Sequence, residues 1–256
     1  MLTNIIRLEL KRLFGKKKLL VLGILGIGLL ITGIVIYLDH GTPQRTSFEA
    51  FSFATGYILP LALPLLAGLS TGDILAEDRQ LGLVPLFVSR GVSPYQYICG
   101  KAIGGIVGQI CLTGGLLVIL LLITFLLFPA GPILTYAADF AKALAATNPV
   151  AYCMVLLLLY VCAATAFSGI ALFASVWIKN IFLVVIIPTI LYLAAFYFFI
   201  SMSFHEINPY SYLGLNQLSY SSLSFTLLKV VGYWITLSVT IHVLAVIAFS
   251  LKKDYS

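Results

Sequence analysis

Two polar residues in apolar stretches have side chains that can act as a nucleophile and as a general base. Ser168 lies in "AFSGI", residues 166–170, and His242 lies in the last apolar run. A histidine that accepts the proton of a serine hydroxyl makes that hydroxyl nucleophilic. The pair therefore suggests hydrolysis inside a membrane. Small and polar residues in membrane helices usually serve packing, so the structural interpretation of both residues stands beside the enzymatic one.

The Ser/His pair resembles the dyad of rhomboid-type intramembrane proteases, with two departures. Ala166 stands where the nucleophile motif has glycine, and no glycine follows His242 at the required spacing. We therefore keep an intramembrane Ser/His protease as the alternative and expect a protein that is not an enzyme.

Motifs for nucleotide and metal chemistry are incomplete. "YQYICGKA", residues 95–102, ends like a phosphate-binding loop, but Tyr95 replaces its first glycine and Ala102 its Ser/Thr. "HEINP", residues 205–209, begins like a zinc motif and lacks the second histidine. The sequence predicts no metal site and no cofactor in this chain, so any ATP and Mg²⁺ would bind to a partner.

The composition is that of a membrane protein. Of 256 residues, 61% are hydrophobic and 9% are charged, and a spanning helix needs about 20 apolar residues. We predict one all-α polytopic unit, residues 1–256, with six transmembrane helices. The apolar runs fall at about 19–38, 51–72, 102–128, 149–178, 180–204 and 230–251.

Basic residues predict the orientation of these spans. The net charge of +6 is concentrated next to the first apolar run, which favours contact with a lipid bilayer and not with nucleic acid. With the N-terminus inside, twelve Lys and Arg residues are cytosolic, and the outer loops hold Arg45, Lys142 and Lys229. We expect a multi-pass protein of the cell (inner) membrane with both termini in the cytosol.

Residues 1–17 predict an amphipathic helix along the inner leaflet. One face carries Leu2, Ile5, Ile6, Leu10 and Leu13. Glu9 projects into the middle of this face, where a carboxylate is costly unless it is paired. It is either part of a solvated helix end or bound to a base from residues 76–101. Separately, Gly100, Gly104 and Gly108 form a face on which another helix can approach closely.

The segment 73–101 is too polar to span a bilayer. Asp73, Glu77 and Asp78 lie near a helix C-terminus, where the dipole disfavours acids. Either this helix end is solvated, or basic groups of the N-terminal helix or of a partner face the acids. Residues 83–88 are apolar without a core of their own and should dock against another surface.

In layout, the chain resembles the membrane subunit of an ABC-2 type transporter, the type V exporter fold. The resemblance rests on "EDRQLGL", "SRGVSP" and "YICGK" between spans two and three, and on "INPYSYLGL" before the last span. Leu83 stands where the family has Thr, and Pro94 where Arg is common. The resemblance covers nearly the whole chain.

The resemblance implies an N-terminal connecting helix, a cytosolic coupling helix within 73–101 and an outer re-entrant segment at 205–227. The residues expected to contact an ATPase are Gly82, Leu83, Leu86, Phe87, Arg90 and Ser93. Glu77 and Arg79 are expected to set the exit angle of the segment by pairing near Glu9 and Arg12. The outer gate is expected at Asn208, Pro209, Tyr210 and Tyr212.

The implied function is that of a permease in an ATP-driven exporter. The family pairs two permeases, identical or with a sister chain, and two cytosolic ABC ATPases. Because no charged pathway is visible, the expected cargo is amphiphilic, such as a peptide antibiotic, a drug or a lipid-linked molecule. A membrane sensor or assembly partner without transport would use the same docking segment and is the other alternative.

Overall fold

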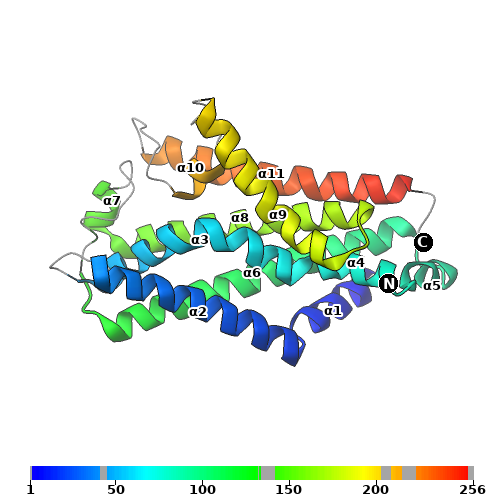
Figure 1. Ribbon diagram of the computed structural model, residues 1–256, viewed down its shortest axis with the longest axis horizontal. Coiled ribbons are helices and arrows are strands. Elements are labelled where there is room, and N and C mark those ends of the chain that lie inside the picture. Colours follow the sequence, from blue (N-terminus) through cyan, green and yellow to red (C-terminus); the bar gives the residue numbers. More distant parts are fainter. Residues whose placement is uncertain are drawn as a thin grey trace.

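A computed structural model of the protein describes residues 2–40, 45–131, 133, 142–202, 209–214 and 223–252 (Figure 1). Every regular element in these ranges is a helix, and six helical stretches are long and apolar enough to cross a membrane. Helices suit this role because each closes its own backbone hydrogen bonds where no water is present. The expected all-α polytopic membrane fold is confirmed.

The long helices are α2 (Lys16–His40), α3 (Ser47–Thr71), α6 (Pro94–Leu127), α8 (Pro149–Trp177), α9 (Ile181–Ser201) and α11 (Leu223–Leu251). The short helices are α1 (Leu2–Leu13), α4 (Asp73–Gln80), α5 (Leu83–Ser89), α7 (Lys142–Thr147) and α10 (Pro209–Gly214). Helix α4 follows α3 after Gly72 alone, so the two form one nearly continuous helical stretch of 34 residues, Ser47–Gln80.

Helices α3 and α8 form the centre of the bundle. In their most apolar windows 72% and 61% of residues are buried, against 28% or less in the other four spans. Aromatic side chains fill the space around α8: the Phe167 ring lies 5.5 Å from Tyr192 of α9 and 5.4 Å from Trp234 of α11. The outer faces of the peripheral helices remain apolar, as a lipid surround requires.

Two glycines let α3 and α9 approach at backbone distance. A Cβ atom on Gly68 would lie 2.1 Å from the carbonyl oxygen of Val185, and one on Gly72 would lie 3.0 Å from its Cγ2. No other residue type fits at Gly68 without moving α9. Close contact through small residues is how membrane helices gain dispersion energy that burial alone does not supply.

The short helices divide between the two ends of the bundle. Helices α1, α4 and α5 gather at the end where α11 finishes, and α7 and α10 lie toward the opposite end (Figure 1). The segment 73–101, which was predicted to be cytosolic and which contains α4 and α5, thus lies beside the N-terminal helix α1. This neighbourhood holds most of the charged side chains that the structure buries.

Candidate functional site: a buried charge cluster below an exposed short helix

Helix α1 lies on the glycine face of α6. The contacts follow the same spacing on both helices: Ile5 on Gly100, Glu9 on Gly104 and Leu13 on Gly108. A Cβ atom added to Gly104 would lie 2.9 Å from the Cβ of Glu9, closer than real side chains approach. The predicted close approach at these glycines is confirmed, and the helix that uses it is α1.

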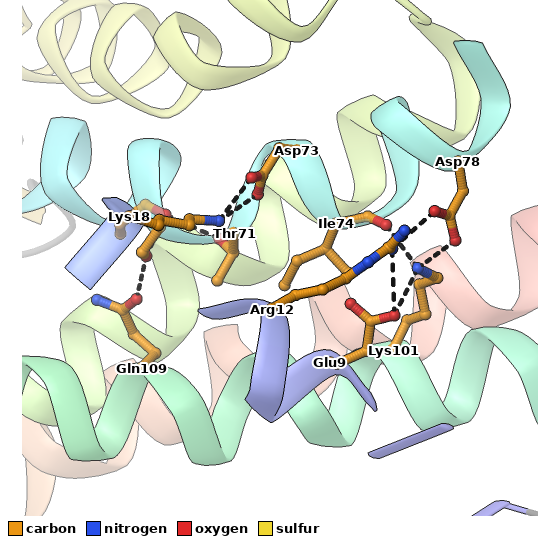
Figure 2. Close-up of polar contacts among 11 residues, drawn as sticks. Glu9, Arg12, Lys18, Thr71, Asp73, Ile74, Asp78, Lys101 and Gln109 are labelled. Carbon is orange, nitrogen blue, oxygen red and sulfur yellow. Dashed lines mark hydrogen bonds and ion pairs between the residues drawn. The ribbon is translucent and has the colours of Figure 1, made fainter. Parts of the chain in front are cut away.

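Lys101 occupies the centre of a buried charge cluster formed by Glu9, Arg12, Asp78 and Lys101. Its Nζ lies 2.7 Å from Glu9 Oε1 and 2.5 Å from Asp78 Oδ2, and it donates to the carbonyl oxygen of Ile74 at 2.6 Å. Three acceptors therefore match the three protons of the ammonium group. Figure 2 shows these bonds converging from α1, α4 and α6.

Arg12 completes the cluster from the outer side. Its Nη1 donates to Asp78 Oδ1 at 2.7 Å and lies 3.6 Å from Glu9 Oε1. The hydroxyl of Tyr97 donates to Asp78 Oδ2. The side chains of Glu9, Asp78 and Lys101 are each 1% exposed. Two acids face two bases, so the cluster is neutral overall, which is the condition for keeping charges out of water.

Glu9 is the least satisfied member of the cluster. Its Oε2 is buried and has no hydrogen-bond partner among the described residues. Burial raises the pKa of Glu9, against the lowering effect of Lys101 and Arg12. For Arg12, partial burial opposes the charge, but Asp78 and Glu9 outweigh it and raise its pKa. As the pH falls, the Glu9 carboxylate therefore takes up a proton at a higher pH than an exposed glutamate does.

A second ion pair joins the start of α2 to α4. The Nζ of Lys18 lies 2.6 Å from both carboxylate oxygens of Asp73 (Figure 2). Deeper in the bundle, Ser70 of α3 donates to Gln109 of α6, which donates to Thr113 at 2.8 Å. Polar contacts therefore hold α4 and the end of α3 to α1, α2 and α6.

The predicted pairing between the N-terminal helix and the 73–101 segment exists, with partly different residues. Glu9 pairs with a base of that segment, as expected, and the base is Lys101. Arg12 bonds Asp78, where the sequence suggested Glu77. Successive helical residues point about 100° apart, so a shift of one residue selects a different neighbour.

Arg79 lies on another side of α4 and caps α8. Its Nη1 donates to the carbonyl oxygens of Ser175 at 2.8 Å and Val176 at 2.6 Å. Carbonyls in the last turn of a helix lack partners within that helix, and a cation there also meets the negative end of the helix dipole. Instead of the expected bond to α1, Arg79 therefore ties α4 to α8.

Helix α5 is bounded by two glycine turns and anchored by its inner face. Gly82 and Gly91 have φ values of 65° and 82°, in the left-handed region that favours glycine. Ser93 then caps α6, its hydroxyl oxygen accepting from the Gln96 amide at 3.2 Å. A short helix, α5, therefore lies where the resemblance implied one within 73–101, with a glycine turn at each end.

Leu86 and Phe87, two of the residues expected to contact an ATPase, differ in exposure. Leu86 is 52% exposed, whereas the ring of Phe87 lies 5.3 Å from that of Tyr97 and is half-buried. Val84 is fully buried with Ile5 and Tyr97. Phe87 therefore helps to seat α5 on the bundle, and Leu86 is the side chain that remains free for another molecule.

A groove of about 450 Å³ separates α1 from α5. We call it the α1–α5 groove; it is lined by Leu8, Lys11, Arg12, Leu83, Leu86, Phe87 and Arg90. Of the six residues predicted to contact an ATPase, four line it, whereas Gly82 and Ser93 form the turns on either side.

Ser168 and His242 lie close together, and each bonds a backbone carbonyl oxygen of its own helix. Both line a cavity of about 10 Å³ together with Lys101. The Ser168 hydroxyl donates to the carbonyl oxygen of Thr165 at 3.0 Å, and His242 Nδ1 contacts the carbonyl oxygen of Ser238 at 2.8 Å. Within the described residues no hydrogen bond joins the two, and this arrangement favours a packing role.

The predicted outer gate is described in part. Asn208 and most of 205–227 lie outside the described residues, as does the side chain of Tyr210. Pro209 begins α10, and Tyr212 is buried with its ring stacked 4.4 Å from that of Tyr233. Trp234 donates to the Tyr212 carbonyl oxygen at 3.5 Å, so this part of the segment packs on α11.

The sequence carried signals for residues that the prediction did not select. Lys101 directly follows Gly100, the first residue of the glycine face, and lies in the segment 76–101 that was expected to supply a base to Glu9. Gln109 is a polar residue in an apolar run, four residues before Thr113. Both features indicate a buried polar partner, because a lone polar side chain inside a helix bundle is unfavourable.

No protein-family model matches the sequence, and a search of curated proteins found no similar one. In the described residues no group of three or more His, Cys, Asp or Glu side chains is placed to hold a metal ion. The structural features that bear on function are the buried charge cluster, the helix α5 and the α1–α5 groove.

Proposed function

We propose that the protein is the permease subunit of an ABC-2 type exporter, driven by a separate cytosolic ATPase that binds ATP and Mg²⁺. One observation carries the proposal. The short helix α5 presents Leu86 to the outside, while ion pairs join the adjoining α4 to α1, α2 and α6, and the pair of Asp78 with Lys101 of α6 is buried. A force applied to α5 would reach several spans through these pairs, because a buried ion pair such as Asp78–Lys101 is costly to separate.

The complete transporter would contain two permeases, identical or paired with a sister chain, and two ATPases. We place α1, α4, α5 and both termini in the cytosol of the cell (inner) membrane, on the basis of the basic-residue bias. The cargo would be amphiphilic, such as a peptide antibiotic, a drug or a lipid-linked molecule, and would pass between the permeases along α3 and α9.

The test is co-purification of the full-length chain with a P-loop ATPase encoded beside its gene, followed by ATPase measurements in lipid vesicles. We expect a stable complex whose ATP hydrolysis responds to the permease. The double substitution Leu86→Ala and Phe87→Ala should weaken binding and stimulation, because truncating large apolar anchors at an interface costs about 2 kcal/mol or more. Leu81→Ala is the matched control, since Leu81 is 62% exposed and does not line the groove.

The same experiment separates the alternatives. An ATPase complex that hydrolyses ATP but moves no amphiphilic probe across the vesicle would favour an assembly or sensor subunit. Proteolysis of a membrane substrate that is lost in Ser168→Ala would favour the protease. Unchanged binding and stimulation in the Leu86/Phe87 double variant would show that α5 only connects α4 to α6 and does not bind the ATPase.

A further inference from the structure

The cavity of about 10 Å³ beside the charge cluster is enclosed by residues of α3, α4, α6, α8 and α11. Four of the residues that line it are polar, and all four are buried: Thr71, Lys101, Ser168 and His242. Its volume is about that of a single water-sized sphere, which is the least space that a buried water molecule needs. The cavity is therefore large enough for one water molecule and too small for an organic ligand.

The hydroxyl and ammonium groups around this cavity donate their protons elsewhere. The Thr71 and Ser168 hydroxyls each donate to a carbonyl oxygen of their own helix, at 2.8 and 3.0 Å. The ammonium group of Lys101 is bonded to three acceptors, two carboxylates of the charge cluster and a carbonyl oxygen of α4. A hydroxyl oxygen that has donated its proton still has lone pairs. Toward the cavity, Thr71 and Ser168 are therefore hydrogen-bond acceptors.

His242 supplies a third acceptor. Its Nδ1 lies 2.8 Å from the carbonyl oxygen of Ser238, which can only accept, so Nδ1 carries the proton. A Cβ atom built on Gly169 would lie 2.7 Å from Nδ1 and 2.8 Å from Cε1, so this edge of the ring faces α8. In the neutral ring Nε2 is then an acceptor. A second ring proton would add positive charge to a cavity that Lys101 lines and no carboxylate lines.

We propose that this cavity binds one water molecule, which donates its two protons to His242 Nε2 and to the hydroxyl oxygen of Ser168 or Thr71. Within the described residues its polar side chains offer acceptors and no free proton, so the ligand must be a donor. A monovalent cation also suits acceptors, but the Lys101 ammonium group lines the same cavity without an offsetting carboxylate. The water would add a hydrogen-bonded link between α11 and its neighbours, whatever the partner or cargo of the protein.

The substitution Gly105→Ala tests the site, because Gly105 lines the cavity from α6. An added Cβ would lie 3.7 Å from Ile74 Cδ1 and 3.9 Å from Thr71 Cγ2, which are ordinary contacts with two other lining residues. Alanine therefore fits, and its methyl group takes the space of the water. We expect a melting temperature in lipid vesicles about 2 °C or more below that of the wild type, because buried acceptors lose their donor.

The matched control is Gly115→Ala, on the same helix and with open space around its added Cβ. In a dry cavity the methyl group of Gly105→Ala would fill a void and raise the melting temperature. A Gly105→Ala protein as stable as the Gly115→Ala protein would therefore overturn the proposal.

A double-mutant cycle separates loss of the water from steric strain. Ser168→Ala removes one acceptor, and no atom of Ser168 lies within 4 Å of the Cβ added at Gly105, so it cannot relieve a clash there. If a displaced water is the cause, Gly105→Ala should lower the melting temperature less in the Ser168→Ala protein than in the wild type. An equal loss in both proteins would indicate strain and contradict the proposal.

The ring of His242 reports its hydrogen-bond donor directly. In the full-length chain labelled with ¹⁵N-histidine, Nε2 of His242 should resonate as an unprotonated, hydrogen-bonded nitrogen, and Gly105→Ala should shift it toward a nitrogen without a donor. The signal is assigned by its loss in His242→Gln. An Nε2 signal that is identical in both proteins would rule the water out. A wild-type melting temperature that is higher in sodium or potassium than in choline, with no such difference in Gly105→Ala, would assign the site to a cation instead.

Discussion

At the scale of single residues, Lys101 is the side chain on which the buried charge cluster depends. It neutralises Glu9 and Asp78 together and also bonds the Ile74 carbonyl oxygen. Removing one partner of a buried pair leaves the other charge without compensation, which is more costly than never burying the pair. The stability of the α1–α4–α6 contact should therefore be far more sensitive at Lys101 than at exposed bases.

Lys101→Met should lower the free energy of unfolding by about 3–5 kcal/mol. Lys18→Met is the control, because its pair with Asp73 is partly exposed and such pairs contribute about 1 kcal/mol or less. Adding Glu9→Gln to Lys101→Met restores charge balance and should recover part of the loss. Denaturant titration in detergent measures all three, and equal losses for Lys101→Met and Lys18→Met would contradict the cluster's role.

Glu9 should give the stability a characteristic pH dependence. Burial raises its pKa above the reference value of 4.5, so the folded protein holds this proton more tightly than the unfolded chain. The contribution of Glu9 to stability is therefore greatest below pH 4.5 and declines as pH rises toward the folded pKa.

The difference in unfolding free energy between wild type and Glu9→Gln isolates this effect from other carboxylates. We expect the wild type to lose stability relative to the variant as pH rises through that interval. A difference that is flat, or that grows in favour of the wild type, would show that Lys101 and Arg12 dominate the ionisation of Glu9.

At the scale of elements, α1 is held by shape as much as by charge. Its contact row of Ile5, Glu9 and Leu13 matches the glycine face of α6 residue by residue. The sequence allowed both surfaces to be predicted, because each follows the helical period. It did not show that the two surfaces face one another, since periodicity within a segment carries no information about which distant segment it meets.

Alanine substitutions at two glycines of α6 should have different effects on the stability of the protein. Gly104→Ala places a Cβ 2.9 Å from that of Glu9 and should destabilise the protein by displacing α1. Gly115 has open space around its added Cβ, so Gly115→Ala should be neutral or stabilise by up to about 1 kcal/mol, as expected for alanine in a helix. Thermal melts of both variants test this, and a stabilising Gly104→Ala would rule out the close packing.

For α4, too, the sequence could not show which distant residues its side chains contact. The acids at the end of span two could be predicted to need bases, because a helix C-terminus disfavours anions. Which acid meets which base depends on the rotation of α4 about its axis. That rotation is determined by contacts with α6 and α8, as the bonds of Asp78 and Arg79 show.

At the scale of the whole molecule, hydropathy alone predicted the six spans. Apolar runs of this length have few alternatives in a bilayer, so the number and order of the helices follow from composition. The central position of α3 and α8 did not follow. Although α3 is the least apolar of the described spans, α8 is no less apolar than the peripheral span α11. Burial of α3 instead reflects small residues such as Gly68, which admit neighbouring helices.

The orientation of the bundle can be tested with two cysteines in a chain whose four native cysteines are replaced. Leu81 and Val150 are 62% and 50% exposed and lie at opposite ends of the spans. We expect an impermeant thiol reagent to label Val150→Cys in intact cells and Leu81→Cys only after permeabilisation. Labelling of Leu81→Cys from outside would invert the proposed topology.

The bond between Glu9 and Lys101 also bears on how the protein is made. The two residues are 92 positions apart, so Glu9 leaves the ribosome well before its partner. Until α6 emerges, α1 can place Glu9 only in water or among lipid headgroups. Insertion of the third span is then the event that captures α1, and a nascent chain stopped before Lys101 should keep its N-terminal helix open to proteases.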